Sequence, residues 1–210
     1  MDIALIVLVV LAVVMLGLVV WMGMPRGPSL EKVVHLKTPQ ILEMGPQKVL
    51  LVRAKGDPNQ VGRKAFGFLM KTYFGLKGVP KGGPDFKPPR ARWPVEAEIP
   101  MEEWEGLYAM PVPETVTHVG GARGGSGLSV ELATWEYGEV AQILHVGRYD
   151  GETSTVEALH GFIRSQGYVI DGPHEEEYLR GPGLLLPGNP DKYLTIIRYP
   201  VKKMFGGTGS

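Results

Sequence analysis

The pattern of hydrophobic and polar positions repeats once along the chain. A strand-like run over residues 48–56 ends in Gly56, and a run of the same length over residues 139–147 ends in Gly147. A turn with an aspartate follows each run, and apolar side chains then recur every three or four residues, which predicts one amphipathic helix per repeat. The predicted apolar stripes are Val61, Ala65, Phe68, Leu69 and Tyr73 in the first helix and Val156, Leu159, Phe162 and Ile163 in the second.

Two further strands are expected after each helix. In the first repeat they cover residues 93–99 and 104–112, and in the second they cover residues 173–179 and 193–201. The order β-α-β-β therefore occurs twice, which predicts an α+β fold with an antiparallel sheet.

The two repeats predict two similar halves of one domain over residues 46–203. The halves span residues 46–113 and 128–203, and the glycine-rich stretch 120–127 is expected to link them. Each half can bury only one face of its helix alone, so the halves should pack side by side and leave a ligand cleft between them.

Residues 1–24 are predicted to anchor the chain in a membrane. Ile3–Met22 is an apolar run that would span about 30 Å as a helix, the hydrocarbon thickness of a bilayer. A cleaved signal peptide would need basic residues before the run and a small-residue cleavage site after it, and the sequence has neither. We therefore expect one transmembrane helix.

The charges beside this segment predict its orientation. Arg26, Lys32 and Lys37 follow the apolar run and no basic residue precedes it, so the N-terminus should lie outside and the domain in the cytoplasm. We expect residues 25–45 to be a tether and lead-in to the domain, and residues 204–210 to be a flexible tail.

Composition excludes several other functions. The 22 basic and 22 acidic residues balance, so no overall field would attract nucleic acid, which is not expected as a partner. The chain has no cysteine, and its histidines do not have the spacing of a metal site, so we predict neither a metal nor a cofactor. No serine stands in the context of a hydrolase nucleophile.

Three segments of the second half resemble the GyrI-like small-molecule-binding family. They are Ile143 to Gly151, with its His-x-Gly-x-Tyr-Asp pattern, residues 165–173, which end in Gly-Pro, and Glu176 to Leu179, with Glu-x-Tyr-Leu. The first half is similar in a looser way, so the resemblance extends over about residues 40–203. It implies a tandem β-α-β-β fold around a ligand cleft. Members include effector domains of multidrug-sensing regulators, gyrase-inhibitory proteins, hydrolases that open cyclopropane rings, and a membrane-anchored autophagy receptor.

The chain departs from the family at one position. Many members carry a cleft-facing glutamate four residues before the last proline, whereas this chain has Ile196 there in the second half and Leu107 in the first. The resemblance therefore does not carry over cation binding or hydrolysis through that glutamate.

Glu176 and Tyr178 are the leading candidates for the ligand site. Both alternate onto one face of the 173–179 strand, opposite Glu175 and Glu177, and they could place a carboxylate and a phenol against a ligand. The alternative is that these consecutive glutamates form a solvated strand end. Further candidates for ligand binding are Glu98, Trp104, Tyr108, Tyr193 and Tyr199, although such aromatic residues more often fill a core.

Three functions follow as hypotheses. The first is a membrane-anchored domain that binds a small amphipathic or aromatic molecule in the cleft. The second is a hydrolase of strained, cyclopropane-containing electrophiles, in which Glu176 and Tyr178 would be catalytic. The third is a membrane-tethered adaptor that binds a protein partner through the long loop of residues 77–92.

Overall fold

The computed structural model describes residues 27–93, 100–119, 127–182 and 188–204. Three predicted segments lie wholly or mostly outside this part of the chain: the anchor at residues 1–24, the glycine-rich linker, and the tail from residue 205 to 210. The helices are α2 (Leu30–Val33), α3 (Pro58–Gly75) and α4 (Thr153–Ser165), with short 3-10 turns η1 (Val34–Lys37), η2 (Met101–Glu103), η3 (Tyr149–Gly151) and η4 (Pro190–Lys192). The strands are β1 (Gln40–Met44), β2 (Gln47–Lys55), β3 (Arg90–Trp93), β4 (Glu105–Pro111), β5 (Val130–Trp135), β6 (Gly138–Val146), β7 (Tyr168–Ile170), β8 (His174–Arg180) and β9 (Leu194–Lys203).

The two halves have the same strand order, as the sequence repeat predicts. The first half runs β2-α3-β3-β4 along the chain, and its last strand lies between the other two. The second half runs β6-α4-β8-β9 with the same arrangement, and the additional short strand β7 pairs with β9. The α+β fold with an antiparallel sheet is therefore confirmed.

The halves meet where an edge strand of one half pairs with an edge strand of the other. Strands β3 and β8 run antiparallel, with Arg90 opposite Glu177, Ala91 opposite Glu176 and Arg92 opposite Glu175. The sheet is thus continuous from one half to the other, in the order β1-β6-β9-β8-β3-β4-β2-β5. We call this junction the seam.

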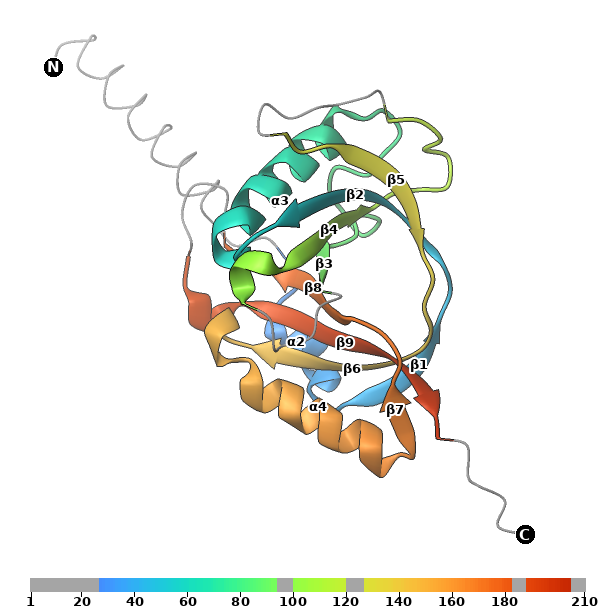
Figure 1. Ribbon diagram of the computed structural model, residues 1–210, viewed down its shortest axis with the longest axis vertical. Coiled ribbons are helices and arrows are strands. Elements are labelled where there is room, and N and C mark those ends of the chain that lie inside the picture. Colours follow the sequence, from blue (N-terminus) through green and yellow to red (C-terminus); the bar gives the residue numbers. More distant parts are fainter. Residues whose placement is uncertain (1–26, 94–99, 120–126, 183–187, 205–210) are drawn as a thin grey trace, which may run out of the picture.

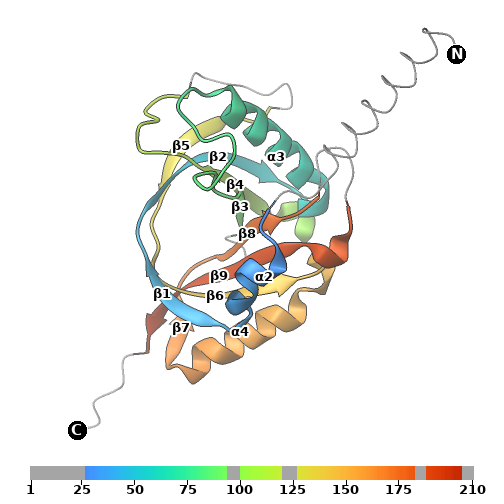
Figure 2. The same cartoon turned by 180° about the vertical axis from the view of Figure 1, so that it is seen from behind.

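The outermost strands are exchanged between the halves. Strand β1 leads directly into β2 of the first half but pairs with β6, and β5 leads into β6 but pairs with β2. Residues 40–44, which the sequence assigned to the lead-in, thereby become part of the sheet. Figures 1 and 2 show the result, a strongly curved sheet with α3 outside one half and α4 outside the other.

Local sequence explains how each helix starts. Gly56 and Gly147 have φ angles of 128° and 132°, a region that side chains with a Cβ rarely adopt, so the strand-ending glycine is required in both halves. In the first half Asp57 caps α3 by accepting a hydrogen bond from the Asn59 N–H at 2.9 Å, and Pro58 occupies the first turn.

Each helix buries the apolar stripe that the sequence predicts. Ala65, Leu69 and Tyr73 of α3 pack on the outer face of the first half, and Leu159 and Ile163 of α4 pack on the outer face of the second. We use outer face for the side of the sheet that α3 and α4 cover, and inner face for the opposite side. The inner face of the second half is covered by Leu30, Val33 and Leu36 from α2 and η1.

The 77–92 loop is shorter and better packed than the sequence indicates. Its last residues, from Arg90, belong to β3, so the strand begins three residues before the predicted start at Trp93. Phe86 packs against Tyr73, whose hydroxyl donates a 2.6 Å hydrogen bond to the Pro80 carbonyl. The loop is therefore fixed to α3.

Within the described ranges, no helix combines the length and the hydrophobicity needed to cross a bilayer. The predicted membrane anchor lies outside those ranges.

Candidate functional site

Strand β8 directs its glutamates to opposite faces of the sheet. Glu175 and Glu177 lie on the inner face and Glu176 lies on the outer face, as strand alternation predicts. All three are buried, with exposed fractions of 1%, 7% and 8% for Glu175, Glu176 and Glu177. The alternative interpretation of a solvated strand end is therefore wrong.

The inner glutamates are neutralised by arginines. Glu175 accepts hydrogen bonds of 2.6 Å from both Arg92 and Arg198, and one of 3.1 Å from the Tyr137 hydroxyl. Glu177 pairs with Arg90 and Arg198, each at 3.1 Å. Because Arg90 and Arg92 come from the first half and the glutamates from the second, this network joins the halves at the seam.

Glu176 on the outer face has a different environment. Its Oε1 lies 3.2 Å from His174 Nε2, and it shares a hydrogen bond with the Tyr178 phenol. Among the described residues no lysine or arginine forms an ion pair with it. A carboxylate that is more than nine-tenths buried therefore lacks the fixed cation that its two neighbours in β8 have.

A second carboxyl group lies beside Glu176. Glu152 sits immediately before α4, and its Oε2 is buried without a hydrogen-bond partner among the described residues. Burial first, and then the charge of Glu176, raise the pKa of Glu152 to about 7, while His174 acts in the opposite direction. This group can therefore gain or lose a proton near neutral pH.

Aromatic side chains surround the two carboxyl groups. The Tyr178 ring meets Phe66 of α3 and Tyr149 of η3 edge to face, with centroids 5.4 Å and 5.7 Å apart. Tyr149 also contacts Tyr193 at 5.3 Å, and Phe66 contacts Tyr108 at 5.0 Å. The aromatic cluster thus extends from α3 across the seam to the start of α4.

The phenols of this cluster remain protonated at neutral pH. Burial first, and then the charge of Glu176, raise the pKa of Tyr108 to about 12 and that of Tyr178 well above its usual value. The Tyr108 phenol can therefore donate a hydrogen bond to a ligand, whereas the Tyr178 phenol is already hydrogen-bonded to Glu176.

A small residue separates Tyr108 from Glu176. Ala91 of β3 pairs with Tyr108 on one side and with Glu176 on the other, so the three form one row across the strands. The Tyr108 hydroxyl is buried and has no hydrogen-bond partner among the described residues. Trp93 Nε1 and His160 Nε2, on either side of the seam, are unpartnered in the same way. Such buried polar atoms normally bind water or a ligand.

The sequence candidates are brought together only in part. Glu176, Tyr178, Tyr108 and Tyr193 belong to the cluster, and Tyr199 adjoins it through a 2.7 Å hydrogen bond between its hydroxyl and His174 Nδ1. Trp104 is half-buried just before β4, where its carbonyl accepts a hydrogen bond from Gly56. Glu98 lies outside the described residues.

Four members of the cluster were not among the sequence candidates, namely Phe66, Tyr149, Glu152 and His174. Glu152 and Tyr149 stand in the turn before α4, where no strand alternation assigns a side chain to a face of the sheet. His174 shares the face of Glu176 by alternation, which was the available signal for it.

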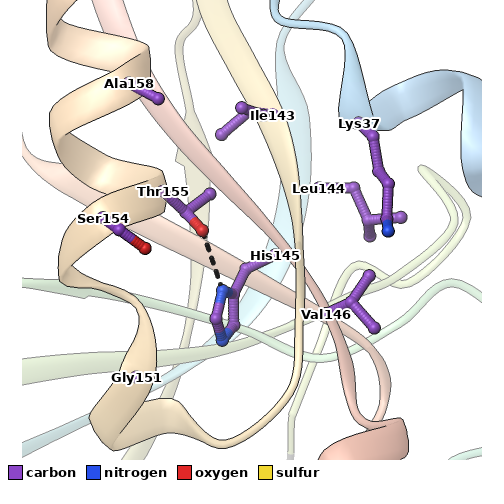
Figure 3. Close-up of a pocket in the computed structure, with 9 residues that line it drawn as sticks. All are labelled: Lys37, Ile143, Leu144, His145, Val146, Gly151, Ser154, Thr155 and Ala158. Atoms are coloured by element: carbon purple, nitrogen blue, oxygen red, sulfur yellow. Dashed lines mark hydrogen bonds between the residues drawn. The ribbon is translucent and has the colours of Figure 1, made fainter.

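An open pocket of about 400 Å³ lies away from this cluster, between the edge of β6 and the first turns of α4 (Figure 3). Strand β9 separates β6 from β8, so the pocket does not reach Glu176 through the sheet. Figure 3 shows His145 pointing toward Thr155, and both of its ring nitrogens are engaged, at 3.0 Å with Thr155 and at 2.9 Å with the Arg148 carbonyl. The hydrogen bonds of His145 therefore connect β6 to the turn before α4 and to the helix itself.

The outer cluster can support two kinds of chemistry. A buried carboxylate among aromatic rings can bind a polar or cationic group of an amphipathic ligand. A pair of adjacent carboxyl groups, of which Glu152 has a raised pKa, next to a protonated phenol can also supply an acid and a base for hydrolysis.

Solved structures with the same fold are known. An uncharacterized conserved protein from Listeria innocua is 25% identical, with a TM-score of 0.63 over 83% of this chain and 99% of that chain. A hydrolase from Listeria innocua is 24% identical, with a TM-score of 0.60 and the same coverage. The C-terminal domain of EcmrR is 14% identical, with a TM-score of 0.58 over 80% of this chain and 98% of that chain. At the identities of the hydrolase and EcmrR, the similarity shows the fold alone.

Comparison of sequences gives a narrower result. No curated protein matches the chain. Residues 129–202, which hold β6, α4, β8 and β9, match the GyrI-like small molecule binding domain family. Residues 129–202 are thus similar to the GyrI-like family, within a fold that the chain shares with the Listeria proteins.

Proposed function

We propose that the chain binds a small amphipathic or aromatic molecule on the outer face of the seam, between α3 and α4. The ligand would place a polar or cationic group against Glu176 and Tyr178 and an apolar body against the aromatic cluster. The match of residues 129–202 to a small-molecule-binding family supports this function.

The observation that carries the proposal is the contrast between Glu176 and the residues on either side of it. Glu175 and Glu177 are neutralised by three arginines, whereas Glu176 is equally buried beside a second carboxyl group and a set of unpartnered polar atoms. Burying a carboxylate without a lysine or arginine partner is costly, and a ligand that supplied positive charge would offset that cost.

Ligand titration of the full-length chain in detergent tests this function. Cationic aromatic dyes, neutral aromatic amphiphiles and haem would be screened by thermal shift, and hits measured by isothermal titration calorimetry in the presence of EDTA. Glu176→Gln and Tyr178→Phe should each weaken binding at least tenfold, because each removes a polar contact. Glu157→Gln, an exposed residue of α4, is the matched control. Equal affinity in all four proteins would place the site elsewhere.

Hydrolysis of strained electrophiles is a second candidate function. It is favoured by the Glu152 and Glu176 pair, in which one carboxyl has a pKa of about 7 and can hold the proton that the reaction must transfer. Turnover of a cyclopropane-containing alkylating compound would be followed by chromatography. The double variant Glu176→Gln with Tyr178→Phe should abolish it, and turnover that persisted would remove both residues from the mechanism.

We also propose that residues 1–24 hold this domain at a membrane, on its cytoplasmic side. The support is the apolar run Ile3–Met22 and the basic residues that follow it. Carbonate extraction of membranes that contain the full chain should leave it in the pellet, and protease added to the outside should spare the domain. Release of the chain by carbonate would contradict the anchor.

A further inference from the structure

Three side chains on the outer face of the seam direct donor atoms at one point. One atom each from Glu152, His174 and Glu176 lies within 4.8 Å of the other two. The closest pair is His174 Nε2 and Glu176 Oε1, at 3.2 Å. Two donors that share a tetrahedral zinc ion, each about 2.1 Å from the metal, lie about 3.4 Å apart. That pair therefore already has the spacing of two ligands of one ion.

The histidine is oriented as metal ligands usually are. Its Nδ1 lies 2.7 Å from the Tyr199 hydroxyl, which fixes the ring and leaves Nε2 facing Glu176. A hydrogen bond from the second ring nitrogen to a neighbouring group is the common outer contact of histidine ligands, and it sets both ring orientation and basicity. Tyr199 belongs to the core between β9 and α4, so this support is rigid.

The two carboxyl groups of the cluster have no lysine or arginine partner in the described part of the chain, and the one cation-forming side chain paired with them is His174. Neither Glu152 nor Glu176 forms an ion pair with a lysine or arginine there, and Glu152 Oε2 is buried without a hydrogen-bond partner. The Tyr108 phenol, which is 1% exposed, lies in the same cross-strand row as Glu176 and is also unpartnered. A bound cation would supply the positive charge that the two carboxyl groups do not receive from a lysine or arginine.

We propose that Glu152, His174 and Glu176 bind a divalent transition-metal ion, with zinc the best fit. One imidazole nitrogen with two carboxylate oxygens suits zinc and its neighbours in the transition series better than calcium or magnesium, which prefer oxygen donors alone. Three protein ligands leave a fourth position open for water or for a donor atom of a bound molecule.

This site deepens the proposed function, because it shares Glu176 with the small-molecule site, but it does not depend on the organic ligand. An ion in this position would select ligands that carry an oxygen or nitrogen donor. It would also give the aromatic cluster a polar centre.

Metal titration tests the proposal. The full-length chain in detergent would be stripped with EDTA, transferred to chelator-free buffer and titrated with Zn²⁺ by calorimetry and with Co²⁺ by visible absorption. One ion per chain should bind, and the Co²⁺ complex should show the intense visible bands of a low-symmetry four-coordinate site. Glu152→Gln and His174→Gln should each weaken binding at least tenfold.

Matched controls separate this site from surface binding. Glu157→Gln on the same helix and His118→Gln in an exposed loop should leave the affinity unchanged. Near-ultraviolet circular dichroism would establish that each variant is folded.

If His174→Gln does not fold, the result for Glu152→Gln alone tests the metal site, because the Glu152 side chain lies at the start of a helix and outside the sheet. Absence of stoichiometric binding, or unchanged binding in Glu152→Gln, would overturn the proposal. Ligand titrations in the presence of EDTA test the small-molecule site separately. Failure of the metal site can therefore be distinguished from failure of the small-molecule site.

Discussion

The buried ion network at the seam makes a quantitative prediction about stability. Replacing Glu175 with glutamine removes one of two carboxylates that neutralise three guanidinium groups. Glu175 is 1% exposed and accepts three hydrogen bonds, from Arg92, Arg198 and Tyr137. The substitution would leave three buried positive charges with Glu177 as their one carboxylate partner among the described residues.

The size of the effect follows from the cost of breaking buried ion pairs. Removing one partner of such a pair costs about 3–5 kcal/mol, because the remaining charge is buried without compensation. Glutamine keeps one acceptor oxygen, so we expect about 3 kcal/mol for Glu175→Gln. For a chain of this length each kcal/mol lowers the melting temperature by about 2–4 °C, which predicts a decrease of about 6–12 °C.

Urea unfolding followed by near-ultraviolet circular dichroism would measure this loss. Glu131→Gln is the matched control, since the Arg53 and Glu131 pair is exposed and should contribute at most about 0.5 kcal/mol. Adding Arg198→Gln to Glu175→Gln restores the charge balance, so the double variant should lose less than the sum of the single variants. A loss below about 1 kcal/mol in Glu175→Gln would refute the assignment of the network as the link between the halves.

Two further perturbations test the outer face. Because the folded chain raises the pKa of Glu152 to about 7, it binds more protons than the unfolded chain between pH 4.5 and 7, so the free energy of unfolding should fall as pH rises through that window. In metal-free protein this decrease in the free energy of unfolding should be at most about 3 kcal/mol, and it should be absent in Glu152→Gln. Equal pH profiles of stability for the two proteins would contradict the prediction. Gly106→Ala would place a Cβ 2.6 Å from the buried Tyr108 ring and should cost about 1–3 kcal/mol, whereas Gly45→Ala, with no atom within 4 Å, should be neutral. Similar unfolding midpoints for both glycine variants would show that Tyr108 is free to move.

Sequence predicts the parts of this fold that depend on local pattern. The repeated strand, glycine and helix are visible because Gly56 and Gly147 must adopt positive φ and because each helix must bury one stripe. A glycine stands at the end of each helix, but only Gly167 after α4 has the left-handed conformation, with φ of 75°, whereas α3 ends at Gly75 without positive φ. The chain can leave a helix in more than one conformation, and the residue type alone does not decide between them.

The parts that depend on pairing between distant strands were not predictable. Residues 40–44 were assigned to the lead-in because so short a run shows little strand alternation. They join the sheet by pairing with β6, almost a hundred positions later in the chain. Arg90 and Arg92 read as loop residues because charge in a short segment normally indicates solvent. Only the position of β3 opposite β8 turns them into partners of Glu175 and Glu177.

Only part of the candidate site was predictable from the sequence, because the rest depends on contacts between distant elements. Alternation and the family resemblance led to Glu176 and Tyr178, which lie in one strand. Glu152 belongs to the site only because α4 begins close to β8 in the folded chain. No local sequence pattern predicts that packing.

A structure of the chain with a ligand found by titration tests the central claim most directly. The account predicts that the ligand lies on the outer face of the seam, between α3 and α4, in contact with Glu176 and Tyr178. A ligand bound in the pocket beside His145 instead, with the surroundings of Glu176 unchanged, would contradict it.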